Sequence, residues 1–176
     1  PAEATATAVL SAREPGVFSG DAVFATAMTA VDPETSVAFH LADGDRFEKG
    51  AVLATVTGKA RAILRAERIA LNLVQRMSGI ATLTSRYVDE VRATSARVVD
   101  TRKTTPGLRA LERHAVRSGG GHNHRFSLSD AVLAKDNHLA VLVEGGRDLT
   151  EALLDARSRL SHTTHFEVEV DRIDQI

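Results

Sequence analysis

The sequence predicts an α/β protein in which a β-rich module and a long helix precede a series of strand–helix units. Apolar residues recur at steps of three and four from Arg61 to Arg92, which is typical of a long amphipathic helix. Three β-branched segments, centred near Val98, Val132 and Phe166, then repeat every 34 residues with helical patterns between them. This alternation predicts parallel βαβ units, which either fan into an open sheet or curl into a barrel.

Composition excludes several classes of protein. The 176 residues are 43% apolar and 26% charged, the balance of a globular domain, and no apolar run is long enough to span a membrane. The first ten residues lack the features of a secretory signal. The absence of cysteine excludes a disulfide framework, a thiolate zinc site and a cysteine nucleophile. We therefore expect a cytoplasmic protein that has no membrane partner.

Residues 16–60 are predicted to form the β-rich module. Alternating apolar residues at 37–41 and 52–56 are bounded by turn-forming Gly, Asp and Pro residues, a pattern typical of short antiparallel strands.

The long helix is expected to bury one apolar stripe, made of Ile69, Leu73, Met77, Ile80, Leu83, Tyr87 and Val91. Gly79 lies inside this helix, where glycine costs about 1 kcal/mol relative to alanine. We expect it to mark close packing or a kink.

Strands are predicted at 96–101, 131–135 and 166–170, separated by helices. Pro106 in a first turn and Gly119 as a stop signal frame the first of these helices, and an apolar pattern from Leu149 to Leu160 indicates the second. Each strand is followed by charged residues, namely Arg102 and Lys103, Lys135 and Asp136, and Glu169 and Asp171. Because α/β proteins build their sites at the C-terminal ends of strands, we expect these residues to be functional.

Positive charge is concentrated in residues 97–125. This segment holds seven Arg or Lys residues and two acidic ones, a net charge of +5, whereas the rest of the chain carries −6. The simplest interpretation is that these cations lie on the solvent-exposed face of a helix. The cations are interleaved with glycine and histidine in predicted loops, which favours an anion site.

Two loops in this segment carry the predicted donors. Residues 100–107 place two cations and three hydroxyl groups between a strand and a helix start, without the order of a phosphate-binding P-loop. Residues 118–125 place three glycines before His-Asn-His-Arg, and we expect their backbone to lie against a ligand. His124 and Arg125 are the candidate donors, in preference to a metal pair formed by His122 and His124.

Lys135 ends a buried strand, so it needs a charged partner or its pKa falls. It suits three roles, as a Schiff-base nucleophile, a general acid or an anion clamp. Glu167, Glu169 and Asp171 lie on one side of the next strand. Carboxylates there suit a divalent cation held through water, or the stabilisation of developing positive charge.

From about Gly20 to Asp171 the chain resembles the quinolinate phosphoribosyltransferase family. Four ordered motifs carry this resemblance: Glu67-Arg68-x3-Asn72, Asp100-Thr101-Arg102-Lys103-Thr104-Thr105-Pro106-Gly107, Gly119-Gly120-Gly121-His122-Asn123-His124-Arg125 and Lys135-Asp136-Asn137-His138.

The resemblance implies a mixed α/β N-terminal domain of the α+β sandwich type over residues 1–95. It also implies an incomplete (β/α) barrel over residues 96–176. Because the family continues for several more β/α units, we expect the chain to be part of a longer protein. The implied reaction transfers ribose 5-phosphate from phosphoribosyl pyrophosphate to the ring nitrogen of quinolinate. Pyrophosphate and CO2 leave, and nicotinate mononucleotide remains. Mg2+ accompanies the pyrophosphate.

The resemblance also assigns roles to residues. Lys135 and Glu169 are implied as catalytic, and Glu169 is implied to lie under the ribose or its magnesium ion, through water. Lys103 is implied to face phosphoribosyl pyrophosphate, and a homodimer or higher homo-oligomer is implied, with Arg68 reaching in from a second subunit. The implied substrate-binding set is Arg68, Thr101, Arg102, Lys103, His124, Arg125, Lys135 and Glu169.

Other interpretations remain open. A phosphoribosyltransferase with the same architecture could use nicotinate or another base, or the chain could be a transferase-like protein of molybdenum-transport operons. A nucleic-acid-binding module at 97–125 is disfavoured by the 4% aromatic content and the acidic remainder. A carrier module with Lys59 near a hairpin tip is disfavoured because the lysine lies off the tip.

Overall fold

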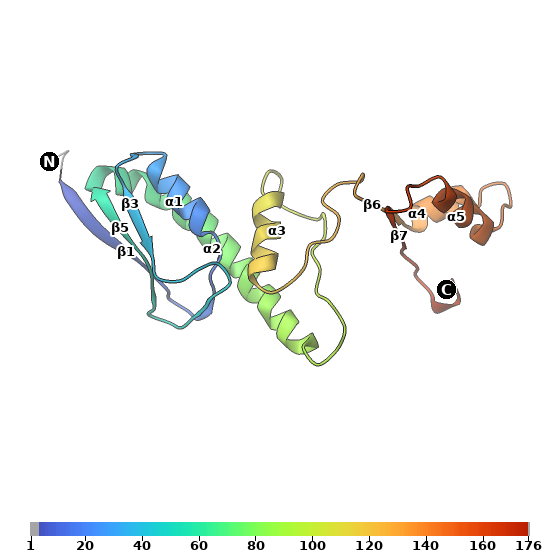
Figure 1. The fold of residues 1–176 in the computed structure, drawn as a ribbon, viewed down its shortest axis with the longest axis horizontal. Coiled ribbons are helices and arrows are strands. Elements are labelled where there is room, and N and C mark those ends of the chain that lie inside the picture. Colours follow the sequence, from blue (N-terminus) through green and yellow to red (C-terminus); the bar gives the residue numbers. More distant parts are fainter. Residues whose placement is uncertain (1–3, 176) are drawn as a thin grey trace. The chain divides into compact units, whose positions relative to one another are not determined.

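The computed structural model describes residues 4–175 and divides into two compact units, Pro1–His124 and Arg125–Ile176. The elements of both units are labelled in Figure 1. In the described residues the first unit contains β1 (Thr5–Ser11), β2 (Gly16–Val17), α1 (Asp21–Thr29), β3 (Ser36–Phe39), β4 (Arg46–Phe47), β5 (Val52–Lys59), α2 (Ala60–Val91) and α3 (Arg109–Ser118). The second contains β6 (Ala131–Ala134), α4 (Asp136–Leu142), α5 (Leu149–Ser158), β7 (His165–Val168) and the short 3-10 helix η1 (Ile173–Gln175).

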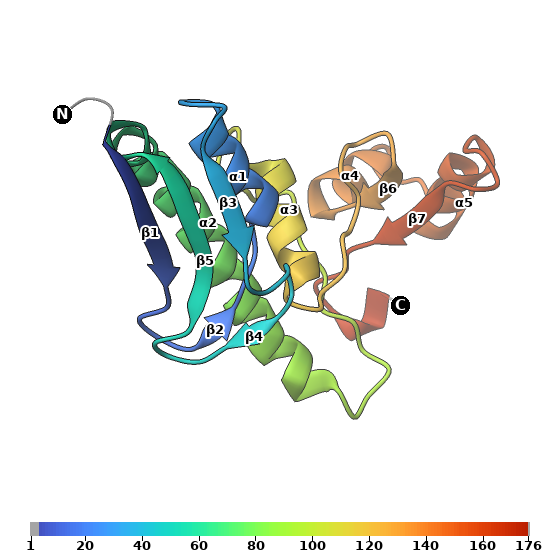
Figure 2. The same ribbon diagram turned by 60° about the vertical axis from the view of Figure 1, so that its left-hand side comes forward.

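An antiparallel sheet with strand order β1-β5-β3 forms one layer of the first unit. Figure 2 shows the three strands side by side, with β5 in the middle. The expected strands at 37–41 and 52–56 are confirmed as β3 and β5. β5 buries Leu53 and Val56 on the face that the helices cover. β2 and β4 form a separate short pair.

Helix α1 was not expected within the β-rich module. Its Phe24 and Met28, four residues apart, are buried. The carboxylate of Asp43, from a distant loop, accepts the N–H groups of Gly20 (2.8 Å) and Asp21 (3.1 Å) at the start of the helix. Because this cap is supplied from outside the helix, no local sequence signal marks it.

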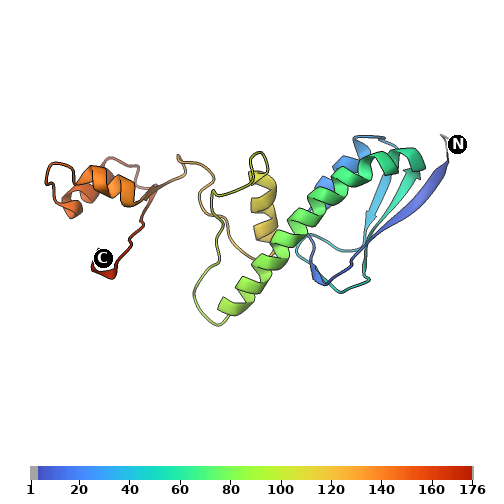
Figure 3. The same ribbon diagram turned by 180° about the vertical axis from the view of Figure 1, so that it is seen from behind.

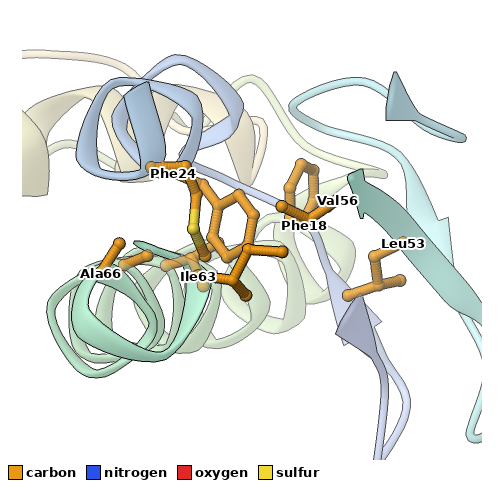
Figure 4. Close-up of a cluster of buried hydrophobic side chains, with 9 residues drawn as sticks. Phe18, Phe24, Leu53, Val56, Ile63 and Ala66 are labelled. Atoms are coloured by element: carbon orange, nitrogen blue, oxygen red, sulfur yellow. The ribbon is translucent and has the colours of Figure 1, made fainter. Parts of the chain in front are cut away.

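The hydrophobic core lies between the sheet and the two helices α1 and α2. Figure 4 shows its main contributors, with Phe18 and Phe24 next to β5 and the first turns of α2. The buried cluster consists of Phe18, Phe24, Met28, Leu53, Val56, Ile63, Ala66, Ala70 and Val74. The rings of Phe18 and Phe24 each lie about 6 Å from that of Phe39, at 6.0 and 6.1 Å.

The expected long helix is confirmed as α2, with 32 residues, but its buried face differs from the expected stripe. Ile69, Leu83 and Tyr87 are 62%, 54% and 59% exposed. The buried positions are instead mostly small: Ala62, Ile63, Ala66, Ala70, Val74, Met77, Ala81, Thr84 and Ser85. Of the expected stripe, Met77 is buried and Leu73, Ile80 and Val91 are half-buried. The small side chains at the other buried positions let neighbouring backbones approach α2 closely. Gly79 does not mark close packing within the described residues, since a Cβ there would meet nothing within 4 Å, and α2 runs through this position without a break.

Helix α3 packs against the second half of α2, whereas the sheet covers the first half (Figure 3). A Cβ on Gly119 would lie 2.4 Å from the carbonyl oxygen of Ala81, and one on Gly121 would lie 2.8 Å from the methyl group of Thr84. The prediction that the backbone of these glycines faces a ligand is therefore wrong for Gly119 and Gly121. They are needed for close contact with α2.

An ion pair adds to this contact. Arg76 of α2 donates through Nε to Oε1 of the buried Glu112 of α3 at 2.9 Å. The other oxygen of Glu112 accepts the N–H of Thr105 at 3.4 Å. Burial raises the pKa of the Glu112 carboxyl, but the hydrogen bonds from Arg76 and Thr105 lower it more, so this pKa lies below its usual 4.5.

The strand expected at 96–101 is wrong as a regular strand. Its backbone forms a single parallel bridge, Val99 with His122. The N–H of His122 donates to Val98 (2.9 Å) and the N–H of Asp100 donates to His122 (3.1 Å). The helix expected after it is confirmed as α3. It begins at Arg109, so Pro106 precedes its first turn.

In the second unit the expected strands at 131–135 and 166–170 are confirmed as the parallel pair β6 and β7. The expected helix between them is confirmed as α5, and the short α4, which was not expected, precedes it. The described residues thus form mixed α/β structure without a closed barrel. The barrel and the domain boundary between residues 95 and 96 stay predictions.

A membrane-spanning helix would have to be both long and apolar. Over residues 4–175, none of the helices meets both conditions.

The glycine contacts generate a prediction about stability. Gly119→Ala should lower the free energy of unfolding by about 1–3 kcal/mol, because the new methyl group overlaps the backbone of α2. Gly79→Ala, at a position in α2 where a Cβ meets open space, should instead raise the free energy of unfolding by about 0.5–1 kcal/mol. Urea unfolding of the two variants measures both changes. Equal stability of both variants would contradict the packing described for Gly119.

The Glu112 ion pair generates a prediction about pH. Because the pKa of Glu112 is lowered in the folded state, its stabilising effect is complete above the usual value of 4.5 and is lost as the pH falls through the lower, folded-state value. Glu112→Gln should therefore destabilise the protein at pH 7, and the difference from wild type should shrink below pH 4.5. Thermal unfolding of both proteins at pH 7 and at acidic pH tests this. A difference that stays constant with pH would contradict it.

Candidate functional site

The predicted site residues fall into three groups, two in the first unit and one in the second. Thr101, Arg102, Lys103 and His124 lie in the loops that flank α3, and Arg68 lies on α2. Arg125, Lys135 and Glu169 belong to the second unit.

Asp100 joins the two loops around α3. Its side chain is 6% exposed and forms an ion pair with Arg113 at 3.1 Å, whose side chain is 12% exposed. The same carboxylate accepts the N–H of His124 at 2.8 Å and a hydrogen bond from the side-chain amide of Asn123. Asp100 thereby fixes His124 close to the segment that carries Arg102.

Arg102 has an unusual environment. Its Nε is buried and has no hydrogen-bond partner. Among the side chains that the structure describes, Thr35 Oγ1 is the one other buried polar atom without a partner. Buried N–H groups are nearly always paired, because an unpaired one costs about 1–3 kcal/mol. An oxygen of a bound anion would remove this cost.

Thr101 and Lys103 shape the same loop. The hydroxyl of Thr101 accepts the backbone N–H of Lys103 at 3.2 Å, while the side chain of Lys103 is exposed. Both residues line a cavity of about 250 Å³ beneath the loop, together with Asp100 and Arg113. Lys103 therefore lines this cavity and is also exposed to solvent.

In the second unit the structure brings Lys135 and Glu169 together. Lys135 follows β6 and Glu169 follows β7, and Nζ of the lysine lies 3.0 Å from Oε2 of the glutamate. The N–H of Glu169 donates to the carbonyl of Ala134 at 2.8 Å, which continues the parallel register beyond the strands. Both charges are thus held at the C-terminal edge of the pair.

A cavity of about 250 Å³ adjoins this edge, and Asp136, Glu169 and Asp171 line it. Over the described residues no three His, Cys, Asp or Glu side chains are grouped closely enough to hold a metal ion by themselves. Elsewhere in this unit, Nη1 of Arg125 donates to the carbonyl of Ala131 at 3.0 Å.

Arg68 is exposed on α2 and lines a groove of about 730 Å³ between this helix and the end of β1. Arg13, Glu14 and Gln75 contribute the other long polar side chains of the groove. Within the first unit, Arg68 lies on α2 beside this groove, whereas Arg102 lies in the loop before α3 and is not among the residues that line the groove.

The sequence interpretation missed three residues of this arrangement, namely Asp100 as an anchor, Arg113 and Asn123. One signal was present. Asp100 and Glu112 are the two acids in a segment with seven cations, and an isolated acid among arginines is a good candidate for a buried partner.

Comparison with family models gives two matches that together cover almost the whole chain. The N-terminal domain of quinolinate phosphoribosyl transferase matches residues 1–78, and the C-terminal domain of the same family matches residues 80–176.

Similar proteins are found among curated sequences. A probable nicotinate-nucleotide pyrophosphorylase (carboxylating) of Bacillus subtilis is 41% identical over 174 residues, covering 99% of this chain and 59% of the relative. A nicotinate-nucleotide pyrophosphorylase (carboxylating) of Mycobacterium leprae is 44% identical over 178 residues, covering 100% and 61%. The chain therefore spans about 60% of the length of these relatives.

Solved structures agree with these matches. NadC from Streptococcus pyogenes superposes with a TM-score of 0.89 at 40% identity, over 98% of this chain and 61% of that one. The nicotinate-nucleotide pyrophosphorylase from Francisella tularensis gives 0.89 at 33% identity, over 98% and 60%. Since matching family models cover both parts of the chain and relatives near 40% identity share its fold, the chain belongs to the quinolinate phosphoribosyl transferase family.

Proposed function

We propose that the protein carrying this chain transfers the phosphoribosyl group of phosphoribosyl pyrophosphate to quinolinate. The products are nicotinate mononucleotide, pyrophosphate and CO2, and the reaction serves NAD biosynthesis. In this proposal β6 and β7 are strands of a (β/α) barrel, and the substrates bind at their C-terminal edge.

The observation that carries the proposal is the buried, unpartnered Nε of Arg102 in a segment with a net charge of +5. A guanidinium is suited to a carboxylate, which it can bind through two parallel hydrogen bonds. Quinolinate carries two carboxylates on adjacent ring carbons. Arg102 binds one of them in this proposal, and His124, Arg125 and Lys135 complete the set of donors.

Glu169 and Thr101, with Lys103, serve the second substrate. Breaking the bond between ribose C1 and the pyrophosphate oxygen leaves positive charge on the sugar, which a nearby carboxylate stabilises electrostatically. Glu169 supplies this carboxylate at the strand edge, 3.0 Å from the ammonium group of Lys135. Lys103, exposed at the rim of its cavity, faces the negative phosphates.

The second bond change, the loss of CO2, needs no electron-accepting group on the enzyme. Once the ring nitrogen is bonded to ribose, the pyridinium accepts the electron pair that CO2 leaves at C2, and C2 then takes up a proton. Lys135 holds the carboxylates in place while this happens.

The residues present fit a magnesium ion that arrives with the substrate. Mg2+ keeps several waters and binds phosphates with one or two carboxylates rather than an all-protein cage. Glu169, Asp136 and Asp171 line one cavity, which suits Glu169 as a contact through water. When bound, the ion neutralises charge on the leaving pyrophosphate.

Arg68 enters the proposal through a second subunit. It is exposed on α2, and the same helix exposes the large apolar residues Ile69 (62%), Leu83 (54%) and Tyr87 (59%) at helical spacing along one side. An apolar stripe of this kind is compatible with an interaction surface. We infer a homodimer or higher homo-oligomer in which Arg68 of each subunit serves its neighbour's site.

The competing candidate is a related transferase that uses nicotinate or another base. A single carboxylate needs fewer cations than Arg68, Arg102, Arg125 and Lys135 provide together. This argument favours the dicarboxylate.

The substrate assay tests the proposal directly. The full-length protein with phosphoribosyl pyrophosphate and Mg2+ should release CO2 from quinolinate and form nicotinate mononucleotide. With nicotinate in its place, the same product should form at least tenfold more slowly, because one carboxylate leaves part of the cationic site unpaired. Chromatography of the products measures both rates. A faster reaction with nicotinate would overturn the proposed substrate.

Arg102→Ala should raise the KM for quinolinate and reduce kcat/KM more than tenfold, since it removes a donor to a substrate carboxylate. Steady-state kinetics in the full-length protein measure this change. Arg117→Ala is the matched control, because it removes an exposed arginine of the same basic segment and lies at the end of α3. Equal losses in the two variants would show that only the overall charge of the segment matters.

A further inference from the structure

The peptide groups of His124 are held from both sides by one buried ion pair. The N–H of His124 donates to Oδ1 of Asp100 at 2.8 Å, and its carbonyl accepts Nη2 of Arg113 at 3.0 Å. Asp100 and Arg113 are themselves joined at 3.1 Å. The neighbouring Asn123 donates its side-chain amide to the carbonyl of Arg113 at 3.0 Å. The main chain at His124 is therefore fixed by a closed set of hydrogen bonds.

Stability alone is a weak reason for this arrangement. The free-energy cost of removing two charges from water offsets much of their mutual attraction. Well-packed apolar residues can therefore often replace a buried ion pair without a loss of folding stability. Both side chains are nonetheless almost completely buried, at 6% and 12% exposure. Their location, between the loop that carries Arg102 and the loop that carries His124, is the distinctive feature.

We propose that Asp100 and Arg113 are positioning residues that set the distance between the two anion-binding loops of the quinolinate site. Asp100 lies two residues before Arg102, and its carboxylate fixes His124. The carbonyl of Arg102 is held in turn by Nη2 of Arg109 at 3.4 Å, so its loop is also anchored to α3. This inference rests on the proposed function, and it adds residues that need not contact the substrate.

Charge balance explains why an acid can serve this purpose within an anion site. An unpaired carboxylate beside Arg102 would repel a dianion and offset the positive charge of the loop. Arg113 neutralises Asp100, and the remaining oxygen contacts go to neutral N–H groups. The positive charges of Arg102 and Lys103 are thereby kept for the ligand.

The test is a kinetic comparison in the full-length protein. Asp100→Ala should raise the KM for quinolinate about tenfold or more, since a misplacement of about 1 Å in a site can cost on the order of 10²-fold. The KM for phosphoribosyl pyrophosphate should rise by a smaller factor, because His124, which Asp100 holds directly, is assigned to quinolinate alone. Asp100→Asn keeps an oxygen that accepts the N–H of His124, so it should recover part of the quinolinate KM.

His114→Gln is the matched control. His114 is the next residue along α3, and its side chain contacts the carboxylate of Asp43 rather than a residue of either loop. Its loss should lower the Tm less than Asp100→Asn does, since the His114 side chain is 51% exposed, and should leave the quinolinate KM unchanged. If Asp100 had a purely structural role, the KM values for both substrates would instead change in both variants in proportion to the loss of Tm.

Amide hydrogen exchange covers the case in which Asp100→Ala does not fold. In wild type, the N–H of His124 should exchange at least tenfold more slowly than in the unfolded chain, since it donates to a buried carboxylate. Exchange at the unfolded rate would overturn the inference, as would an unchanged quinolinate KM in a folded Asp100→Ala. No turnover of quinolinate by wild type would instead overturn the proposed function, on which this inference rests.

Discussion

Close packing along helix α2 is the constraint on which the first unit depends. Its buried face is formed mostly by small residues, so the sheet can approach its first half and α3 its second half. The glycines at 119 and 121 are the matching requirement on the α3 side, since a Cβ at either position would meet α2 at 2.4 or 2.8 Å. The loops that begin and end α3 take their positions from this contact. A site built on those loops therefore depends on residues that contact no ligand.

The two acidic residues of the basic segment, Asp100 and Glu112, make the same kinds of contact. Glu112 pairs with Arg76 of α2 and Asp100 pairs with Arg113 of α3, and both carboxylates are largely buried. Each acid also accepts a backbone N–H from a loop, that of Thr105 or that of His124. Acidic residues thus neutralise Arg76 and Arg113, which hold the loops to the helices, whereas the proposed function assigns Arg102 and Lys103 to an anion. The net charge of +5 therefore does not show which cations of the segment are paired with an acid inside the fold.

Much of this could be predicted from the sequence, and the failures have physical causes. The long helix, the strands β3, β5, β6 and β7, and helices α3 and α5 follow from local periodicity, as does the location of Lys135 and Glu169 after neighbouring strands. Helix α1 was missed because its start is capped by Asp43 from a distant loop. The buried face of α2 was misjudged because alanine packing is decided by the partner surface. The anchoring role of Asp100 was missed because Arg113 and His124 are far from it in sequence.

The ion pair between Lys135 and Glu169 is suited to a site that must change partners. Its side chains are 38% and 52% exposed, and such a pair contributes only on the order of 0–1 kcal/mol. Separating the two groups therefore costs little when a carboxylate approaches the lysine. The glutamate is then released as a negative charge at the same strand edge, where the proposed reaction develops positive charge on the ribose. A buried pair at this position would be harder to separate, because removing one partner would leave an uncompensated charge away from water.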